Sequence, residues 1–451
     1  MNAPKLKRTI GLSAVSFIAI GFMIGGGVFV FTGIALKITG PALPIAYALA
    51  GIPVFISMLP MAMLGSAIPT SGGNYKYPCR MFSPAIAFVG IWTYALCSFF
   101  GLIPLLANSC AMYLQSFLPG IPSLLVALIL VTSFYLINLL GVKIAATIQG
   151  ILVVILVSAL LFYSGAGLLA INPLKFNDIL QKGTGNLLLG AALLTFTYTG
   201  ANAILELGGE IIAPGKIIPK AFMISFSVVA VIYILVAIAT VSVANSEILN
   251  ESKEPLILAS NLMFNGPGRM FFIFGGAIIA LTTTLNALFI TGTKSFLVII
   301  QDKLLPEFLG KISPRFKTPY RVLTFFWIIS VLGIISGFPP ETLAAYSSLG
   351  ALVIMVPIQL AAISFPQKYP EHYAAADFKL KGIWQIVCPL TGIVLTLFFG
   401  IIILIDLGSL YKTGGFILFM IFATVYFHLR KKFLLAKGID LDKLKNKNDW
   451  V

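Results

Sequence analysis

Long apolar runs, separated by short clusters of proline, glycine and charged residues, fill most of this chain. A run of about 20 apolar residues is long enough to cross a bilayer as a helix. Bounding the runs by proline, glycine and charge predicts twelve membrane spans, at residues 11–36, 42–67, 84–117, 121–141, 145–171, 187–210, 219–244, 270–299, 321–337, 342–365, 384–405 and 414–429. The pattern therefore predicts an all-α membrane protein embedded in a lipid bilayer.

The first span contains a glycine-rich stretch, GFMIGGGVF, that is unusual for a helix in the membrane. Each of Gly25, Gly26 and Gly27 costs about 1 kcal/mol of helix propensity relative to alanine. Main chain without helical hydrogen bonds is tolerated in a bilayer only where protein covers it or where it lines a wet cavity. The stretch predicts either a close helix crossing or a helix break that presents main-chain groups to a ligand.

The sixth span carries a second anomaly, the polar stretch TFTYTGAN, which contains three threonines, a glycine and an asparagine. Two interrupted helices at corresponding positions of two halves are typical of an inverted-repeat transporter. This pattern predicts repeat 1 at residues 11–171 and repeat 2 at residues 187–365, followed by two appended spans at 384–429. Residues 1–10 and 430–451 flank these repeats.

Basic residues are distributed unequally between the two sets of loops. With the N-terminus placed in the cytoplasm, about four-fifths of the 30 lysines and arginines fall on the cytoplasmic side. This bias predicts cytoplasmic N- and C-termini in the cytoplasmic (inner) membrane. The net charge of +15 is then a topological signal and does not indicate a nucleic-acid partner. The basic tail at 430–451 is predicted to be a solvated anchor that faces lipid.

Charged and metal-ligating residues are scarce. Hydrophobic residues make up 59% of the chain and charged residues 10%, a composition that excludes soluble classes. The four cysteines and two histidines lack metal-ligand spacing, so they predict neither a metal centre nor a disulfide framework. No GxxxxGK[ST] motif occurs, which argues against direct use of ATP.

Four motifs, in order along the chain, resemble those of the amino acid–polyamine–organocation family of permeases. They are GFMIGGGVF in the first span, EIIAPGKIIPKA after the sixth, LTTTLNALFITGTKSF in the eighth, and QDKLLPEFLGKISPRFKTPY behind it. The resemblance covers about residues 8–430. It implies a LeuT-type fold with a 5+5 inverted repeat, broken helices 1 and 6 and two additional helices. It also implies alternating access around an amino-acid site between helices 1 and 6.

The chemistry of an α-amino acid zwitterion suits two such breaks. Amide groups at the start of a half-helix, where the dipole is positive, can bind the carboxylate, and freed carbonyls can bind the ammonium. The predicted substrate-binding residues are Ile24, Gly25, Gly26, Gly27, Phe196, Thr197, Thr199 and Asn202. By resemblance, Phe196 is the aromatic gate over the substrate; plain helix packing is the alternative. Asn202 stands where the family often has glutamate, so a role for that carboxylate is not expected here.

The coupling ion follows less directly from the residues. Proton-coupled members of the family carry a lysine in the fifth helix, and the matching position here is Leu156. Without that cation, Na⁺ is a candidate coupling ion, held by the carbonyls of Gly21 and Ile24 and the hydroxyls of Thr282 and Thr283, with Thr284 beside them. The alternatives are threonines that bond within or between helices, exchange, or another route for H⁺. No other cofactor is expected.

Glu206 and Glu210 are the only carboxylates within a predicted span, and an acid in the membrane is a functional candidate by default. Glu210 matches the family signature, lies near the predicted cytoplasmic end of the span and is expected to form a structural ion pair with a lysine or arginine of a loop. Glu206 is a candidate for gating or proton relay; attraction of a cationic substrate and bonding between helices remain open.

The sequence as a whole predicts a secondary active amino-acid transporter that is not an enzyme. Aromatic residues along the spans favour a neutral substrate, among them Trp92, Tyr94, Phe99, Phe100, Phe196 and Tyr198. The alternatives are an exchanger of cationic amino acids or polyamines and a non-transporting amino-acid sensor. A membrane-embedded enzyme would need a convergent set of catalytic side chains, and a channel would show uptake that does not saturate.

Overall fold

The structure, a computed structural model, describes residue 8 and residues 10–115, 120–140, 142–176, 178–243, 255–316 and 318–450. Its regular elements are helices, and two isolated β-bridges accompany them. The first ten helices are α1 (Leu12–Ile24), α2 (Gly27–Thr39), α3 (Leu43–Ala67), α4 (Gly73–Met81), α5 (Pro84–Cys97), α6 (Ile103–Gln115), α7 (Ser123–Leu140), α8 (Val142–Leu169), α9 (Thr184–Tyr198) and α10 (Ala203–Glu206). The others are α11 (Pro214–Val243), α13 (Pro255–Met263), α14 (Pro267–Met270), α15 (Ile279–Gln301), α16 (Tyr320–Ile335), α17 (Pro340–Lys368), α18 (Pro370–Ala375), α19 (Trp384–Asp406) and α20 (Leu410–Leu435).

Within the described residues, every predicted apolar run falls on helical segments; the predicted run ends at 116–117, 141 and 244 lie outside the described residues. Ten helical stretches of the described residues are long and apolar enough to cross a membrane. The first stretch, Leu12–Ala67, spans 56 residues and contains both the first and the second predicted run. The run predicted at 321–337 forms the shorter apolar helix Tyr320–Ile335. Two π-helical segments, Ser98–Leu102 and Phe271–Ile278, connect α5 to α6 and α14 to α15 within single long stretches.

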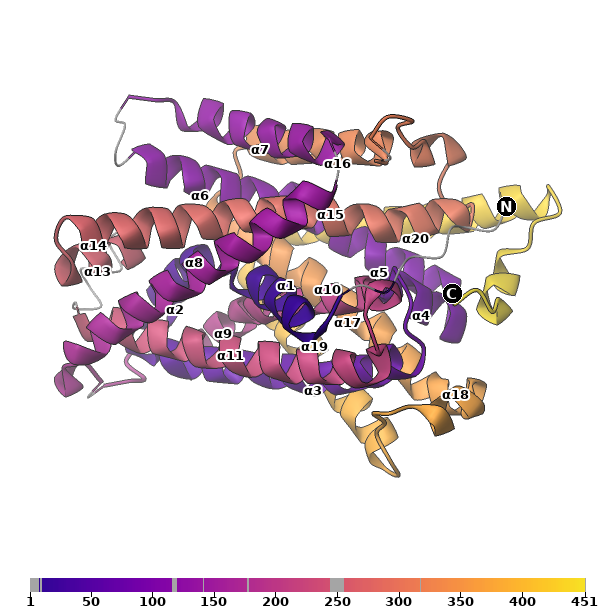
Figure 1. The fold of residues 1–451 in the computed structure, drawn as a ribbon, viewed down its shortest axis with the longest axis horizontal. Helices are drawn as coiled ribbons and strands as arrows, with labels where there is room; N and C mark the ends of the chain where they lie inside the picture. The colour runs from indigo at the N-terminus through magenta and orange to yellow at the C-terminus, as the bar shows by residue number, and fades with distance from the viewer. Residues whose placement is uncertain are drawn as a thin grey trace.

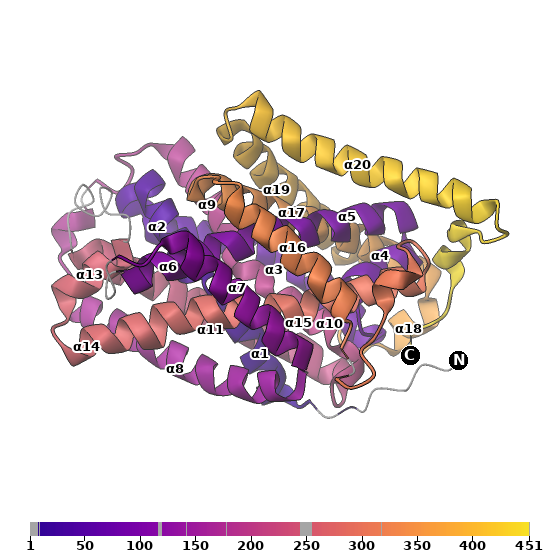
Figure 2. The ribbon, with the colours of Figure 1, turned by 90° about the horizontal axis from the view of Figure 1, so that it is seen from above.

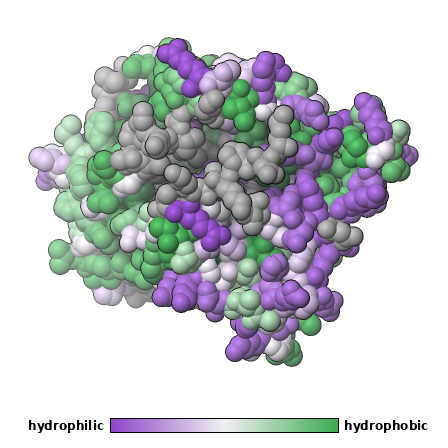
Figure 3. Space-filling view, turned by 45° about the vertical axis from the view of Figure 1, so that its right-hand side comes forward, coloured by the Kyte–Doolittle hydropathy of each residue, from purple (hydrophilic) through white to green (hydrophobic). Residues whose placement is uncertain are grey.

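The outer surface of the bundle is apolar over a wide area. Leu140 on α7 is 63% exposed, Ile405 on α19 is 73% exposed and Leu418 on α20 is 69% exposed. Figure 2 shows α20 along one edge of the bundle, next to α19. In Figure 3, hydrophobic side chains cover one part of the surface and hydrophilic ones gather over another. A soluble monomer does not expose so much apolar surface, and a lipid environment accounts for it. The chain is therefore a multi-pass membrane protein.

The tail that follows α20 lies beside α4 at one end of the bundle, which we call the terminus-bearing end (Figure 1). Near the N-terminus, the amide of Ile10 donates to the Glu210 carbonyl at 3.1 Å, and the amide of Ile212 donates to the Ile10 carbonyl at 2.9 Å. A second bridge joins Ser71, just before α4, to Leu207, just after α10. These backbone bonds close the terminus-bearing ends of the two predicted broken helices against each other. Residues 1–7 and 9 of the predicted N-terminal segment lie outside the described residues.

The C-terminal tail packs onto the protein, so the prediction of a solvated, lipid-facing anchor is wrong for its last residues. The Arg80 guanidinium on α4 is fully buried and binds the Asp302 carboxylate through two hydrogen bonds of 2.8 Å. The same guanidinium binds Asp449 of the tail at 2.9 Å, and the Trp450 ring stacks on Tyr77. The five N–H donors of a buried guanidinium need acceptors, and bidentate carboxylates are strong ones; a distant segment of the chain supplies the second carboxylate.

Candidate functional site

The first membrane helix is interrupted at the predicted glycines. Helix α1 ends at Ile24, α2 begins at Gly27, and Gly25 and Gly26 form a turn between them. A Cβ atom on Gly25 would lie 1.7 Å from Thr284 Oγ1, and one on Gly26 would lie 2.4 Å from a methyl carbon of Leu106. The break therefore requires glycine because α15 and α6 approach its backbone closely.

The amide groups at this break are partly bonded within the protein. The amide of Gly25 donates to the Gly21 carbonyl at 3.1 Å, and that of Gly26 donates to Thr284 Oγ1 at 2.7 Å. Gly27 is the first residue of α2, whose opening amides have no partner inside their own helix. In this structure the positive end of the α2 helix dipole thus lies at Gly27, and the Thr284 hydroxyl accepts from the amide of the preceding residue, Gly26.

The second break lies at the predicted polar stretch of the sixth span. Helix α9 ends at Tyr198, residues Thr199–Asn202 form a 3-10 turn, and the short helix α10 follows. The turn packs directly on the first break, because a Cβ on Gly200 would lie 2.7 Å from the Met23 amide nitrogen. A Cβ on Gly27 would lie 3.3 Å from the Thr197 methyl group. The structure thus brings together the two breaks that the sequence predicts, from positions far apart in the chain.

Side chains around the second break bond mainly to their own helix. The hydroxyl of Thr197 donates to the Leu194 carbonyl and that of Thr199 donates to the Phe196 carbonyl, both at 2.7 Å. The Phe196 ring is half-buried and stacks on Phe31 of α2, with ring centroids 4.8 Å apart. Phe196 therefore joins α2, the second half of the first broken helix, to α9, a position suited both to packing and to closure over a ligand.

Tyr233 on α11 is a residue of this site that sequence reasoning missed. Its fully buried hydroxyl contacts two main-chain carbonyls, that of Met23 at 2.5 Å and that of Thr197 at 3.1 Å. These carbonyls lie in the last turns of α1 and α9, just before the two breaks, so a single hydroxyl contacts both helix ends. No local motif marks this tyrosine, because its role depends on where α11 lies relative to α1 and α9.

The threonines of the predicted Na⁺ site bond along their own helix. Thr282 donates to the Ile278 and Ile279 carbonyls, and Thr283 donates to the Ala280 carbonyl at 3.0 Å. Both oxygens keep lone pairs that could face a cation. On α8, Leu156 is buried, and the side chain that packs against Gly21 is the apolar Val153. The side chain of α8 that contacts Gly21 is therefore uncharged.

The two carboxylates of the sixth span have separate surroundings. Glu210 forms an ion pair as predicted, but its partner at 3.0 Å, Lys294, lies within helix α15 and not in a loop. Glu206 is buried and accepts a hydrogen bond from the Ser295 hydroxyl at 2.8 Å. Asn202 lines a small cavity together with Glu206, so its side chain belongs to a second polar cluster beside the breaks.

Comparison with known proteins agrees with this arrangement. The sequence profile of the amino acid permease family matches residues 10–433. The chain belongs to this family. A branched-chain amino acid permease of Bacillus subtilis is 25% identical over 448 residues, covering 95% of this chain and 94% of that protein. A methylthioribose transporter of the same species is 28% identical over 394 residues, covering 83% of this chain and 84% of the relative. A serine/threonine exchanger, also from Bacillus subtilis, is 26% identical over 336 residues, or 71% of this chain and 75% of the relative.

These findings confirm the resemblance carried by the four motifs. Membership of the amino acid–polyamine–organocation permeases places the chain among transporters and not among enzymes. The relatives support amino-acid transport in general terms, and they differ from one another in the substrate that each name states.

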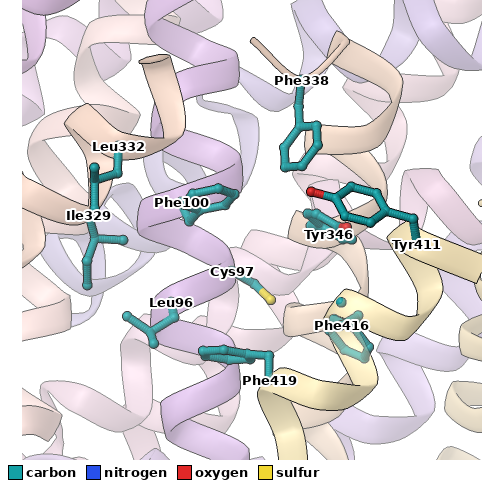
Figure 4. Close-up of a pocket in the computed structure, with 11 residues that line it drawn as sticks. Leu96, Cys97, Phe100, Ile329, Leu332, Phe338, Tyr346, Tyr411, Phe416 and Phe419 are labelled. Carbon is teal, nitrogen blue, oxygen red and sulfur yellow. The ribbon is translucent and has the colours of Figure 1, made fainter. Parts of the chain in front are cut away.

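The aromatic residues that favoured a neutral substrate do not form one pocket in this permease. Tyr94 and Phe99 line the cavity beside Glu206, whereas Trp92 stacks among rings that include Tyr426 of α20. Phe100 lines a different, apolar pocket of about 400 Å³ between α5, α16, α17 and α20 (Figure 4). That pocket has no charged side chain and does not touch either break, so it does not suit a zwitterion.

Proposed function

We propose that this permease is a secondary active amino-acid transporter of the cytoplasmic membrane that works by alternating access. The observation that carries the proposal is that the 3-10 turn Thr199–Asn202 packs against the last turn of α1, directly before the break at Gly25–Gly26, in a member of the amino acid permease family. Broken helices that meet at mid-membrane expose main-chain donors and acceptors to a substrate. Main-chain groups recognise the carboxylate and ammonium that all α-amino acids share and leave side-chain selection to the surrounding walls.

The proposed architecture is a LeuT-type fold with twelve spans. Repeat 1 comprises residues 11–171, repeat 2 residues 187–365, the appended helices residues 384–429, and the tail residues 430–451, with both termini in the cytoplasm. The breaks in the first and sixth spans support this division because they occupy matching positions in the two repeats. On this topology the backbone bonds of Ile10 with Glu210 and Ile212 close the cytoplasmic side. Opening that side then requires α1 and α10 to separate.

In the proposed site, amides at the start of α2 bind the substrate carboxylate, and carbonyls at Ile24, Phe196, Thr197 and Thr199 bind its ammonium. Three internal partners compete for these groups in the closed structure: Thr284 holds the Gly26 amide, Tyr233 contacts the Thr197 carbonyl, and the Thr199 hydroxyl donates to the Phe196 carbonyl. A bound amino acid must offer equivalent hydrogen bonds to displace them. Phe196, stacked on Phe31, is the proposed outer gate.

A thermal-shift screen of the purified permease against the proteinogenic amino acids, putrescine and methylthioribose tests this function. A ligand that binds only the folded state raises stability, by about 2.7 kcal/mol at a concentration 100 times its dissociation constant. Gly27→Ala inserts a methyl group between the breaks, and Gly33→Ala is its matched control on α2. The added Cβ of each would meet a side-chain carbon at 3.3 Å, Thr197 for Gly27 and Pro255 for Gly33. We expect amino acids to stabilise the wild type and Gly33→Ala but not Gly27→Ala. Stabilisation of Gly27→Ala equal to that of Gly33→Ala would refute this site.

The same screen distinguishes the substrate and ion alternatives. Stabilisation by lysine, arginine or putrescine alone would favour an exchanger of cationic substrates. Binding without counterflow in proteoliposomes would indicate a sensor. The Na⁺ alternative rests on Gly21, Ile24, Thr282 and Thr283, and it predicts that replacing Na⁺ by choline abolishes the amino-acid shift.

A further inference from the structure

A small cavity lies between the helix breaks and the terminus-bearing end of the permease. We call it the Glu206 cavity and define it by Asn74 of α4, Asn202 of the 3-10 turn, Glu206 of α10 and Ser295 of α15, all of which line it. Phe22 of α1 closes one side. Its volume of about 30 Å³ is enough for one water molecule. The cavity is thus bordered by the elements that must separate when this end opens.

Several polar atoms in this cavity lack a partner. Ser295 donates to one oxygen of the Glu206 carboxyl group, and the other oxygen, Oε2, has no hydrogen-bond partner. The side-chain oxygen of Asn74 and both amide atoms of Asn202 are also without partners, although all three residues are at most 4% exposed. Buried polar groups are almost always hydrogen-bonded, so a cluster of unpaired atoms around one void indicates a bound species.

The charge of Glu206 narrows what that species is. The groups that face it from the neighbouring elements are the Tyr94 phenol on α5, the Tyr77 phenol on α4 and the Lys294 ammonium on α15. Lys294 is already paired with Glu210 at 3.0 Å, and the described residues give Glu206 no ion pair of its own. An isolated buried carboxylate costs several kcal/mol, so a positive charge must enter the cavity to neutralise it.

We propose that Glu206 binds and releases the proton that drives transport, and that the Glu206 cavity is this proton's binding site. In the closed structure the proton is on Oε2, and the resulting O–H group donates to an amide oxygen of Asn74 or Asn202, directly or through one water. When the cytoplasmic side opens, the O–H bond breaks, the proton passes to cytoplasmic water and the carboxylate becomes solvated. A proton fits better than Na⁺, because one of the unpaired groups of the cavity is the NH₂ group of Asn202, which would repel a metal ion. This inference rests on the proposed transport function.

The first experiment needs no substrate. Infrared spectra of purified wild type and Glu206→Gln at neutral pH are compared in the C=O stretching region of carboxylic acids. We expect a band from a protonated, buried carboxyl group in the wild type that is absent from Glu206→Gln and retained in Asp406→Asn. Asp406 at the end of α19 is the control because it lies outside the Glu206 cavity. Identical spectra for wild type and Glu206→Gln would overturn the proposal.

The second experiment separates coupling from translocation. Proteoliposomes take up labelled L-leucine, either by counterflow or against its gradient under an imposed pH difference of one unit. One coupled proton supports about tenfold accumulation per pH unit. We expect Glu206→Gln to keep counterflow and to lose this accumulation, while Asp406→Asn keeps both.

Two results would refute the coupling: pH-driven accumulation by Glu206→Gln at the wild-type level, or wild-type accumulation that follows a Na⁺ gradient and ignores pH. Failure of the wild type to exchange any amino acid would instead refute the proposed function, and the infrared comparison would still report on Glu206.

Discussion

Arg80 is buried at the terminus-bearing end of the bundle, and its replacement provides a sharp test of how the tail and the loop after α15 are held. The change Arg80→Met keeps most of the side-chain volume and removes the guanidinium. Asp302, whose side chain is 1% exposed, then loses both 2.8 Å hydrogen bonds and keeps only the Tyr75 hydroxyl at 3.0 Å and Lys447 at 3.4 Å. Breaking a buried ion pair by removing one partner costs about 3–5 kcal/mol. Because two partners remain, we expect the lower end of that range, about 3 kcal/mol.

The assay is the half-life of the folded, monodisperse protein in detergent at a fixed elevated temperature, followed by size-exclusion chromatography. Unfolding of a protein of this kind is usually irreversible, so a rate is the appropriate measure. Arg430→Met is the matched control, since Arg430 is only half-buried, donates to the Lys303 carbonyl at 3.0 Å, lies over the Phe433 ring and has no ion pair among the described residues. We expect a large loss for Arg80→Met and little change for Arg430→Met. The double variant Arg80→Met/Asp302→Leu should recover most of the loss, because it removes the unpaired charge. Equal half-lives for Arg80→Met and Arg430→Met would refute the reasoning.

Three further predictions concern the breaks and the tail. Tyr233→Phe should destabilise the permease by about 1–3 kcal/mol, because it leaves the Met23 and Thr197 carbonyls without this hydroxyl; an unchanged melting temperature would contradict it. Gly200→Ala should cost more than Gly185→Ala in the same thermal assay, since its Cβ would lie 2.7 Å from the Met23 backbone whereas nothing lies within 4 Å at Gly185. Burial by itself would raise the pKa of Asp449, but hydrogen bonds from Arg80 and Lys447 outweigh it and hold that pKa below the ordinary 3.8. The stabilisation that Asp449 gives the tail contact is therefore complete above pH 3.8 and is lost only as the pH falls below that value. Trp450 fluorescence should thus stay constant from neutral pH to about pH 5. A change in that signal between pH 8 and 6, absent from Trp450→Phe, would contradict it.

The sequence alone was sufficient to place the helices and the two breaks. Twenty-residue apolar runs have no stable alternative to a helix in a bilayer, so each predicted run is helical in the structure. Gly25–Gly27 and the polar stretch at Thr199–Asn202 are costly in a membrane helix, and that cost makes both breaks visible in the amino-acid sequence itself. The Glu210 ion pair was also predictable, because a carboxylate near a membrane surface needs a basic partner.

Contacts between distant segments could not be predicted from the sequence. Tyr233 contacts the ends of α1 and α9, Thr284 accepts from the Gly26 amide, and Asp449 binds Arg80. No sequence motif predicts these partners. A membrane helix satisfies its backbone hydrogen bonds within one segment, so a local apolar run is enough to predict it. The partners of side chains depend instead on how the helices pack against one another. For the same reason Glu206 was only an acid of open role in the sequence. The tertiary structure places Glu206 beside Asn74, Asn202 and Ser295 in one cavity. There its carboxylate would be buried without an ion pair, so its charge must be neutralised.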